Sequence, residues 1–476
     1  MQMNVEELGR FEKDNKLFDR TYNGVPYWQI IRLTVYESIF TDHIDRKIKI
    51  KEKIGTGQLL KNLCKGLFYA ARSNSGLRKE KEYDVICFKA DSNKDKFFDY
   101  WNMPIEISNL FIRGNNDINE LKFEPKYNIN APYLKANISF YIKKRLLRCK
   151  YDLKERQFID QILNELKDIY GQCISTSYIE KEILRYIEYR KYYTPFFEKL
   201  FKKVNCKAIM VVWYYQMPMM IAYQVAKRMG IRVIELQHGV INNHEQYWFE
   251  DQRGVNNYTP DYFLAFGRLH IEWTKMLPST RCLSVGYPFQ EHEIETLKDM
   301  QPEKKTIIIY PEDQNEFELV IDKFVNMASN EGFNILMKLH PLQATQYEVY
   351  YPILSKNKKI RVIQDQSKGI YYWLRLGKFH VMANTTVGFE ALAFDHTNIC
   401  VAENINHEQV QPLLDWGLAR GFHTPEELLE LIRNPINREG ITNNGVWEPN
   451  AEKNIQKFLL NLHKQGYPDG KSYKES

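Results

Sequence analysis

Short runs of apolar residues, separated by polar segments that contain glycine or proline, recur along much of the chain. Many of their members are β-branched or aromatic, which is typical of buried strands. Between residues 83 and 290 such runs lie at 84–88, 207–213, 232–237, 262–266 and 282–285. Helical patterns occupy 152–170, 178–204 and about 219–229. We therefore expect a mixed α/β region here.

The pattern becomes more regular after residue 305. Strand candidates at 306–310, 334–339, 360–363, 379–382 and 399–402 alternate with helical segments at about 316–330, 346–356, 369–377, 386–393 and 407–417. Strands and helices that alternate at this period form parallel βαβ units, because each helix packs back on the sheet. The pattern predicts a doubly wound, Rossmann-like domain.

These patterns divide the chain into five parts. Residues 1–80 are expected to form a helical, basic N-terminal region, and 81–290 a first Rossmann-like domain. A polar stretch at 291–305 is expected to link it to a second Rossmann-like domain at 306–424, before closing helices and a tail at 425–476. The predicted fold class is therefore α/β, with two doubly wound domains that face each other across a cleft.

The composition is that of a globular protein. Of 476 residues, 44% are hydrophobic and 26% are charged, which excludes a disordered chain and a coiled coil. The net charge of +6 is too small over this length to indicate nucleic-acid binding. Seven scattered cysteines without a Cys-x-x-Cys motif argue against a disulfide framework and against a zinc site.

Nothing in the sequence predicts a membrane span or a leader. No apolar run approaches the ~20 residues that a helix needs to cross a bilayer. Residues 1–20 lack the apolar core of a secretory signal. With the unpaired cysteines, these features predict a protein of the reducing cytoplasm.

Positive charge is concentrated in one segment. Residues 46–81 contain eleven Lys or Arg and two Glu, a local net charge of +9, and the rest of the chain is slightly acidic. Apolar residues recur at helical spacing between Leu59 and Ala71, so 59–72 is predicted to be a basic amphipathic helix. Such a helix either docks on an anionic membrane surface, on the inner face of the cell membrane, or packs on the protein with its cations in water. Both interpretations stay open.

The candidate chemistry lies where predicted strands end, because ligands bind at the carboxyl ends of parallel strands. Ten of the eleven histidines lie at or beyond position 238. His238 follows one strand and precedes Gly239, which permits a sharp turn, and His340 follows another and precedes Pro341. An imidazole there has a pKa near neutrality. Each histidine alone also fits a structural hydrogen-bonding role, but two at facing sheet edges favour a functional one.

The segment at Thr385 and Thr386 is the best candidate anion site. Two hydroxyls and the free N–H groups of a helix start, at the positive end of the helix dipole, can hold a diphosphate without a metal. An ordinary helix cap explains the same residues. Glu390, four residues after Thr386, lies on the same side of that helix and could accept hydrogen bonds from sugar hydroxyls. Its alternative role is a solvated surface acid.

These residues form an ordered set of motifs. They are His238-Gly239, Val285-Gly286-Tyr287-Pro288, Pro311-Glu312-Asp313, Lys338-x-His340-Pro341 and Thr385-Thr386-x-Gly388-x-Glu390-Ala391-Leu392. In this order the set resembles the two-domain GT-B glycosyltransferases. More narrowly it is similar to bacterial capsule and surface-polysaccharide transferases, which include sialyl- and Kdo-transferase groups and CDP-glycerol glycerophosphotransferases. The resemblance covers about residues 205–420.

The resemblance implies an inverting, metal-independent transfer from a nucleotide-activated sugar to a glycan or glycolipid acceptor of the cell surface (capsule, O-antigen or lipooligosaccharide), with no cofactor. His340 and Lys338 would contact the donor phosphate beside Thr385 and Thr386. Glu390 would bind ribose or donor-sugar hydroxyls. The sequence contains no Asp-x-Asp, the motif with which metal-dependent transferases hold a cation.

Two residues compete for the role of general base. The resemblance to the sialyltransferase-like groups implies Asp313, and the resemblance to the glycerophosphotransferases implies His238. Gln314 stands where the former groups usually have glycine, which weakens the assignment of Asp313. The base therefore stays open between these two residues, with His340 as a third residue of the reacting centre.

Other functions fit the same architecture. Non-hydrolysing UDP-sugar 2-epimerases share the two domains and bind a nucleotide diphosphate, but they have no use for a basic membrane-docking helix. A CDP-glycerol-type transferase moves glycerol phosphate instead of a sugar. A non-enzymatic alternative is a degenerate GT-B module that serves as an assembly factor in polysaccharide export.

Overall fold

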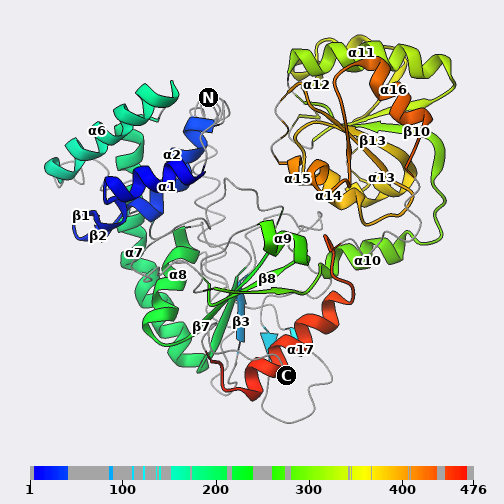
Figure 1. Cartoon of the computed structure of the whole chain (residues 1–476). Helices are drawn as coiled ribbons and strands as arrows, with labels where there is room; N and C mark the ends of the chain where they lie inside the picture. Colours follow the sequence, from blue (N-terminus) through cyan, green and yellow to red (C-terminus); the bar gives the residue numbers. More distant parts are fainter. Residues whose placement is uncertain are drawn as a thin grey trace.

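The computed structural model describes residues 5–40, 85–88, 110–111, 122–123, 136, 139–140, 152–171, 174–211, 217–237, 239, 260–273, 280–312, 314–340, 343–344, 346–365, 367–405, 407, 409–436 and 445–468. Two parallel sheets form the framework of these residues, one five-stranded and one six-stranded. Figure 1 shows each sheet with helices packed around it. Short antiparallel pairs complete the described strands, β1 (Thr21–Tyr22) with β2 (Val25–Pro26) and β4 (Leu110–Phe111) with β5 (Lys122–Phe123).

The strands of the first sheet lie in chain order. They are β3 (Val85–Phe88), β6 (Ala208–Val211), β7 (Arg232–Leu236), β8 (Tyr262–Ala265) and β9 (Arg281–Ser284). Ile209 and Val211 enter a core shared with α7 (Thr176–Val204) and α8 (Met217–Arg228). Ala208 and Met210, which alternate with them, enter a second core with α17 (Ala451–Lys464). Because both faces are covered, the strands are mostly apolar, and the sequence pattern finds them.

The second sheet has the strand order of the dinucleotide-binding Rossmann folds. Along the sheet its strands are β12 (Ile360–Ile363), β11 (Asn334–Lys338), β10 (Glu303–Ile309), β13 (Gly377–Met382), β14 (Asn398–Ala402) and β15 (Arg420–Phe422). Numbered within the domain, the order is 3-2-1-4-5-6. Successive strands are added on one side of β10 up to β12 and on its other side from β13 onward. In folds of this kind ligands bind at the carboxyl edge where the strand order reverses in this way.

Helices cover both faces of this second sheet. One face forms a core with α11 (Asn315–Asn330) and α16 (Pro425–Arg433). The other face packs against α13 (Ile370–Leu376), α14 (Val387–Ala391) and α15 (Gln411–Asp415). This second core also contains Phe266, Tyr287 and Phe289 of the first domain. The two domains therefore share one apolar core.

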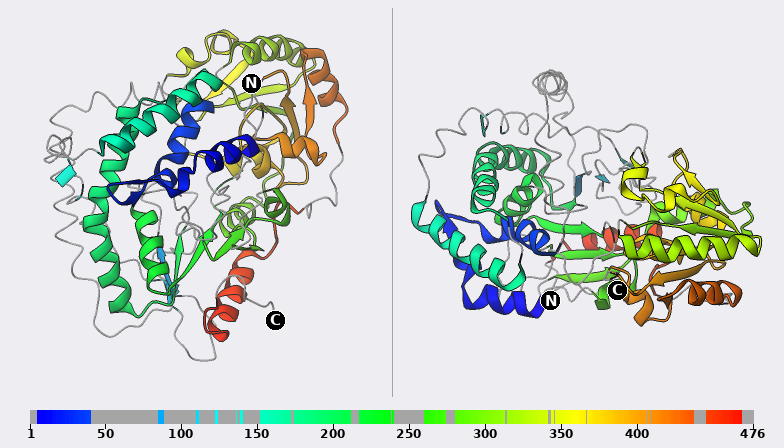
Figure 2. Two further views of the ribbon diagram at one scale, coloured as in Figure 1. Left: turned by 60° about the vertical axis from the view of Figure 1, so that its left-hand side comes forward. Right: turned by 90° about the horizontal axis from the view of Figure 1, so that it is seen from above.

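The N-terminal helices pack on helices that lie far away in sequence. The helix α2 (Trp28–Phe40) shares a core with α6 (Leu153–Tyr170) and the first part of α7, and Figure 2 shows the blue and teal helices together. Glu12 of α1 (Val5–Asp14) pairs with the buried Arg32 and accepts a hydrogen bond of 2.8 Å from Trp28 Nε1. A buried ion pair needs such added partners to offset desolvation.

The last described helix packs on the first domain. After α16 the chain returns, and α17 lies against the first sheet (Figure 1). Residues 445–451, which we call the strap, precede and start this helix. The N–H of Glu448 donates to Phe266 O at 2.8 Å, and that of Leu269 donates to Gly445 O at 2.9 Å. The strap, which follows the second domain in the chain, is thus hydrogen-bonded to the first domain.

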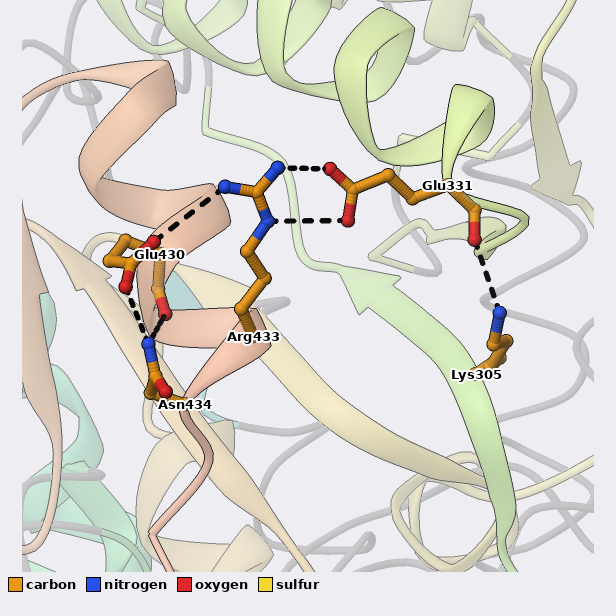
Figure 3. A network of polar contacts seen from close by, with 5 residues as sticks. All are labelled: Lys305, Glu331, Glu430, Arg433 and Asn434. Carbon is orange, nitrogen blue, oxygen red and sulfur yellow. Dashed lines mark hydrogen bonds and ion pairs between the residues drawn. The ribbon is translucent and has the colours of Figure 1, made fainter.

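An ion-pair network joins α16 to the end of α11 (Figure 3). The Arg433 guanidinium contacts both carboxylate oxygens of Glu331, and Lys305 Nζ donates to the Glu331 carbonyl oxygen at 3.1 Å. The hydrogen bonds from Arg433, and then the charges of Arg433 and Lys305, hold the pKa of the Glu331 carboxyl below its usual value. The network is exposed and lies near the amino ends of the strands, away from the carboxyl edge. Its role is to join two helices.

The predicted fold class, α/β with two Rossmann-like domains, is confirmed by the two parallel sheets. Some element predictions are wrong in extent. The polar stretch 291–305 contains most of α10 (Pro288–Thr296) and the first residues of β10, and the segment 346–356 forms only α12 (Tyr347–Tyr350) and a 3₁₀ turn at Leu354–Lys356. The strand β15 was not predicted, because three residues carry no periodicity.

The basic segment 46–81, with its predicted helix at 59–72, lies outside the described residues. Among the helices that the structure describes, none combines the length and the apolar character that crossing a bilayer requires.

Candidate functional site

The loops that carry the candidate residues gather at the carboxyl edge of the second sheet. The strand β10 ends next to Tyr310, Pro311 and Glu312, β11 ends at Lys338, and β13 leads into 383–386. The strands β10 and β13 are neighbours at the point where the strand order reverses, and β11 lies on the other side of β10. The fold therefore brings Glu312, His340 and the Thr385 segment to one edge, as the sequence predicts.

Hydrogen bonds tie two of these loops, those after β10 and β13, to each other and to the loop after β14. The backbone N–H of Asn384 donates to Glu312 Oε1 at 3.2 Å. The Asn384 side-chain oxygen in turn accepts from the N–H of Gln409 at 2.8 Å. Glu312 thus orients the start of the Thr385 segment, and this carboxylate has a structural partner that the sequence alone could not identify.

Lys338 and His340 stand side by side at the end of β11 and differ in exposure. Lys338 is 7% exposed, and its Nζ donates to Leu339 O at 3.2 Å. Burial lowers the pKa of this ammonium, and the Asp365 carboxylate acts in the opposite direction. The His340 side chain reaches solvent. Partial desolvation and, secondly, the Lys338 charge lower the pKa of its imidazole. A buried ammonium beside an accessible imidazole suits an anionic ligand.

The segment Thr385–Thr386 differs from the predicted anion site in one respect. The helix that follows is α14, of five residues, where the sequence predicts 386–393. A helix of little more than one turn has a small dipole, so the two hydroxyls must supply more of any anion affinity. Thr385 Oγ1 accepts weakly from the N–H of Val387 at 3.5 Å. The Thr386 hydroxyl makes no hydrogen bond to another described residue and stays available to a ligand.

Close packing fixes the position of α14. A side chain at Gly388 would place its Cβ 2.8 Å from Leu413 Cδ1 and 3.0 Å from Met382 Sδ. Only glycine lets α14 approach the end of β13 so closely. The glycine of this motif therefore has a packing role.

Glu390 is the most unusual group at this edge. Its Oε2 atom is buried and has no hydrogen-bond partner among the described residues. Burial raises the pKa of the carboxyl group to about 8. A buried polar atom without a partner is costly. A ligand hydroxyl would supply the missing bond. The residue as a whole is partly exposed, so the alternative role of a surface acid stays open beside it.

On the first domain, a buried glutamine holds the end of β7. Gln237 Nε2 donates to Gly239 O at 2.8 Å and lies 3.0 Å from His270 Nδ1, and Gln237 Oε1 accepts from the N–H of Phe266 at 2.7 Å. His238 itself lies outside the described residues, as does Asp313. The assignment of the base to either residue stays a prediction.

The carboxyl edges of the two sheets meet at two short helices. The helix α9 (Arg268–Trp273) follows β8, and α14 follows β13. The ring of His270 on α9 lies 5.8 Å from that of Phe389 on α14, and Trp273 stacks on Phe389 at 6.0 Å. Complete burial lowers the pKa of His270 to about 3, so this imidazole is neutral. The helix that carries Thr386 and Glu390 is therefore seated on the first domain.

No three His, Cys, Asp or Glu side chains of the described residues come together as a metal-ion site requires. Four candidate positions of the second domain, Lys338, His340, Thr385 and Thr386, together with Glu390, lie at one sheet edge or in the helix that follows it. Sequence reasoning missed Gln237 and His270. No local signal marks them, because their role rests on partners about 30 residues away.

No family model matches the sequence, and a search among curated proteins finds no similar one. Solved structures with a similar course of the chain include UDP-GlcNAc 2-epimerase from Neisseria meningitidis, at 14% identity and a TM-score of 0.45, over 63% of this chain and 88% of that one. The same enzyme from Methanocaldococcus jannaschii has 13% identity and a TM-score of 0.42, over 57% and 82%. MurG from Acinetobacter baumannii has 13% identity and a TM-score of 0.36, over 62% and 80%. The two parallel sheets and their strand orders define the fold of this chain.

Proposed function

We propose that the chain is a GT-B glycosyltransferase that moves a sugar from a nucleotide-activated donor to a cell-surface glycan or glycolipid. The observation that carries this proposal is the buried, unpartnered Oε2 of Glu390 in α14, the helix that Thr386 precedes, at the strand-order reversal of a Rossmann sheet. A ligand that places hydroxyls on Glu390 and phosphate on the threonines satisfies both groups. A nucleotide sugar has both features.

The remaining residues of this edge fit the same donor. In this proposal Lys338 and His340 contact the diphosphate, because a buried cation beside an accessible imidazole neutralises phosphate charge. Thr385 and Thr386 supply hydroxyl donors, and Glu390 binds ribose or sugar hydroxyls. Glu312 has its carboxylate on Asn384 and therefore shapes the loop.

The reaction proposed is a single inverting displacement. The acceptor hydroxyl oxygen forms a bond to the anomeric carbon while the bond from that carbon to the diphosphate breaks. The hydroxyl proton passes to the base, which is His238 or Asp313, and the negative charge on the leaving nucleotide is stabilised by Lys338, His340 and the threonines. The acceptor would bind on the first domain.

A melting experiment tests donor binding. CMP, CDP, UDP and GDP are added separately in the presence of a chelator, and we expect at least one to raise the melting temperature without a divalent metal. Glu390→Gln should reduce that shift, whereas Glu426→Gln, an equal change at an exposed position of α16, should not. No shift with any nucleotide would argue against the proposal.

A turnover experiment separates the proposed transfer from its rivals. With nucleotide sugars and a polysaccharide or glycolipid fraction, the transferase releases nucleotide only when acceptor is present, and His340→Ala lowers the rate. Change of the sugar without acceptor identifies an epimerase. Transfer from CDP-glycerol identifies a glycerophosphotransferase. Nucleotide binding without any turnover favours an assembly factor.

A further inference from the structure

One buried tyrosine links two loops of the candidate donor site. Tyr351, directly after α12, is fully buried, and its hydroxyl lies 2.8 Å from Gln343 Oε1 and 3.3 Å from Pro311 O. Both partners are acceptors, so the single hydroxyl proton is shared between them. The tyrosine is separated from Pro311 by 40 residues, and no sequence motif marks it.

The two acceptors belong to the loops that carry the proposed site residues. Pro311 directly precedes Glu312 in the loop after β10. Gln343 lies in the loop after β11, and its N–H donates to His340 O at 2.9 Å. A short path therefore runs from His340 through Gln343 and Tyr351 to Pro311.

This path continues into the Thr385 segment. Glu312, one residue after Pro311, accepts from the Asn384 N–H, and Thr385 follows Asn384. The hydroxyl of Tyr351 thus connects the loop after β11 to the loop after β10, which is itself hydrogen-bonded to the loop after β13.

The ring of Tyr351 is firmly held, so its hydroxyl has a defined position. The ring lies in the core beneath the sheet with Leu339 and Leu354. The backbone after it is fixed as well, because the buried carboxylate of Glu318 accepts from the N–H groups of Ile353 and Leu354 at 2.8 and 3.0 Å. A buried, fully supported polar network specifies one arrangement of the groups that it joins.

We propose that Tyr351 is a positioning residue of the donor site. Its hydroxyl fixes the His340 loop relative to the Glu312 loop, so that residues of both loops contact the same ligand. This inference rests on the proposed function, because the ligand is taken to be a nucleotide sugar or its nucleotide.

Tyr351→Phe removes only the hydroxyl and keeps the ring in the core. Tyr350→Phe is the matched control, since it makes the same change one residue earlier. Tyr350 is half-buried, and its hydroxyl makes no hydrogen bond to another described residue. CMP, CDP, UDP and GDP are titrated calorimetrically into each protein. We expect Tyr351→Phe to weaken nucleotide binding roughly fivefold to tenfold. The control should change it less than about twofold.

A second readout does not depend on nucleotide. The imidazole signals of His340 are recorded by histidine-selective NMR and assigned with His340→Gln. Tyr351→Phe should shift them in the free protein, and Tyr350→Phe should not. Unchanged His340 signals together with unchanged affinity would overturn the positioning role.

The two proposals can fail separately. If no nucleotide binds to any form, the proposed function fails, and the His340 signals alone decide the role of Tyr351. If Tyr351→Phe does not fold, Gln343→Leu removes the acceptor at the half-buried end of the same path and must give the same shift of the His340 signals. Absence of that shift also refutes the inference.

Discussion

The indole Nε1 of Trp447 donates a hydrogen bond of 2.9 Å to the backbone carbonyl oxygen of Phe389. Trp447 belongs to the strap, which is hydrogen-bonded to the first domain, and Phe389 belongs to α14 of the second. The Trp447 ring also lies 5.2 Å from Phe266 and 6.2 Å from Tyr287 of the first domain. One side chain thus fixes the helix of Thr386 and Glu390 against the other half of the molecule.

Trp447→Phe should destabilise the seat of α14. The change removes the hydrogen bond and part of the ring, at a cost of about 1–3 kcal/mol. Trp373→Phe is a matched contrast in the same core, because the Trp373 Nε1 is buried without a partner among the described residues. We expect a larger fall in melting temperature for Trp447→Phe, with faster amide exchange in residues 387–391. Equal effects of the two changes would contradict this role.

Gly286→Ala should be among the most damaging single changes. Its φ of +91° disfavours any other residue, and a Cβ would lie 2.1 Å from Glu448 O and 2.8 Å from Ala451 Cβ. Gly417→Ala shares the left-handed conformation, with φ +67°, but meets nothing within 4 Å. We expect about 1–2 kcal/mol of destabilisation for Gly417→Ala, and a larger loss for Gly286→Ala, measured by thermal unfolding. Similar losses of unfolding free energy in the two variants would show that the strap moves aside to accommodate the new Cβ at little cost.

Glu390 should make the stability of the free protein fall as pH rises. Its pKa is raised by burial to about 8, so from about pH 4.5 to pH 8 the unfolded chain ionises while the folded protein keeps the proton. In this window the folded state binds more protons, and each pH unit lowers the free energy of unfolding by up to about 1.4 kcal/mol. Glu390→Gln removes this dependence. A constant difference in stability between the two proteins across the window would refute the burial of this carboxyl group.

Nucleotide affinity should increase as pH falls, through His340. Desolvation and the Lys338 charge lower the pKa of this imidazole below its usual value, so it is mostly neutral at pH 7 and gains a charge that attracts phosphate below its pKa. His340→Gln should flatten the dependence and weaken binding severalfold at acid pH. The comparison is made by calorimetry between pH 5 and 8 with one nucleotide, whose own titration cancels in the difference. Parallel curves would show that the protonated imidazole of His340 does not contribute to phosphate binding.

Membrane docking is one of the two interpretations of the basic segment 46–81, and it has a direct test. We expect sedimentation with vesicles of anionic lipid that decreases as salt rises, because exposed charges are screened over about 10 Å at 0.1 M salt. Replacement of Lys61 and Lys65 by Gln should weaken it. Sedimentation that ignores lipid charge would remove the membrane from the proposal and leave the transfer chemistry untouched.

The sequence predicts this fold well where the pattern is local. The strands are found because buried parallel strands are mostly apolar, and the second domain because strand and helix alternate at a regular period. The positions of Lys338, His340 and Thr385 follow from this, since residues at the carboxyl ends of neighbouring parallel strands must come to one edge. The roles of Asp313 and His238 stay predictions from the sequence.

The tertiary structure alone decides which polar groups find a hydrogen-bond partner and which are buried without one. Tyr351 bonds to a residue 40 positions away, and Trp447 to one 58 positions away. The burial of Glu390 Oε2 requires the complete core around it. Composition and spacing cannot encode such contacts, because a hydrogen bond requires two groups within about 3 Å, and the fold sets that distance. The sequence by itself determined the sheets and the edge at which the chemistry lies; the packing of α14, the strap and the buried tyrosine decided how that edge is built.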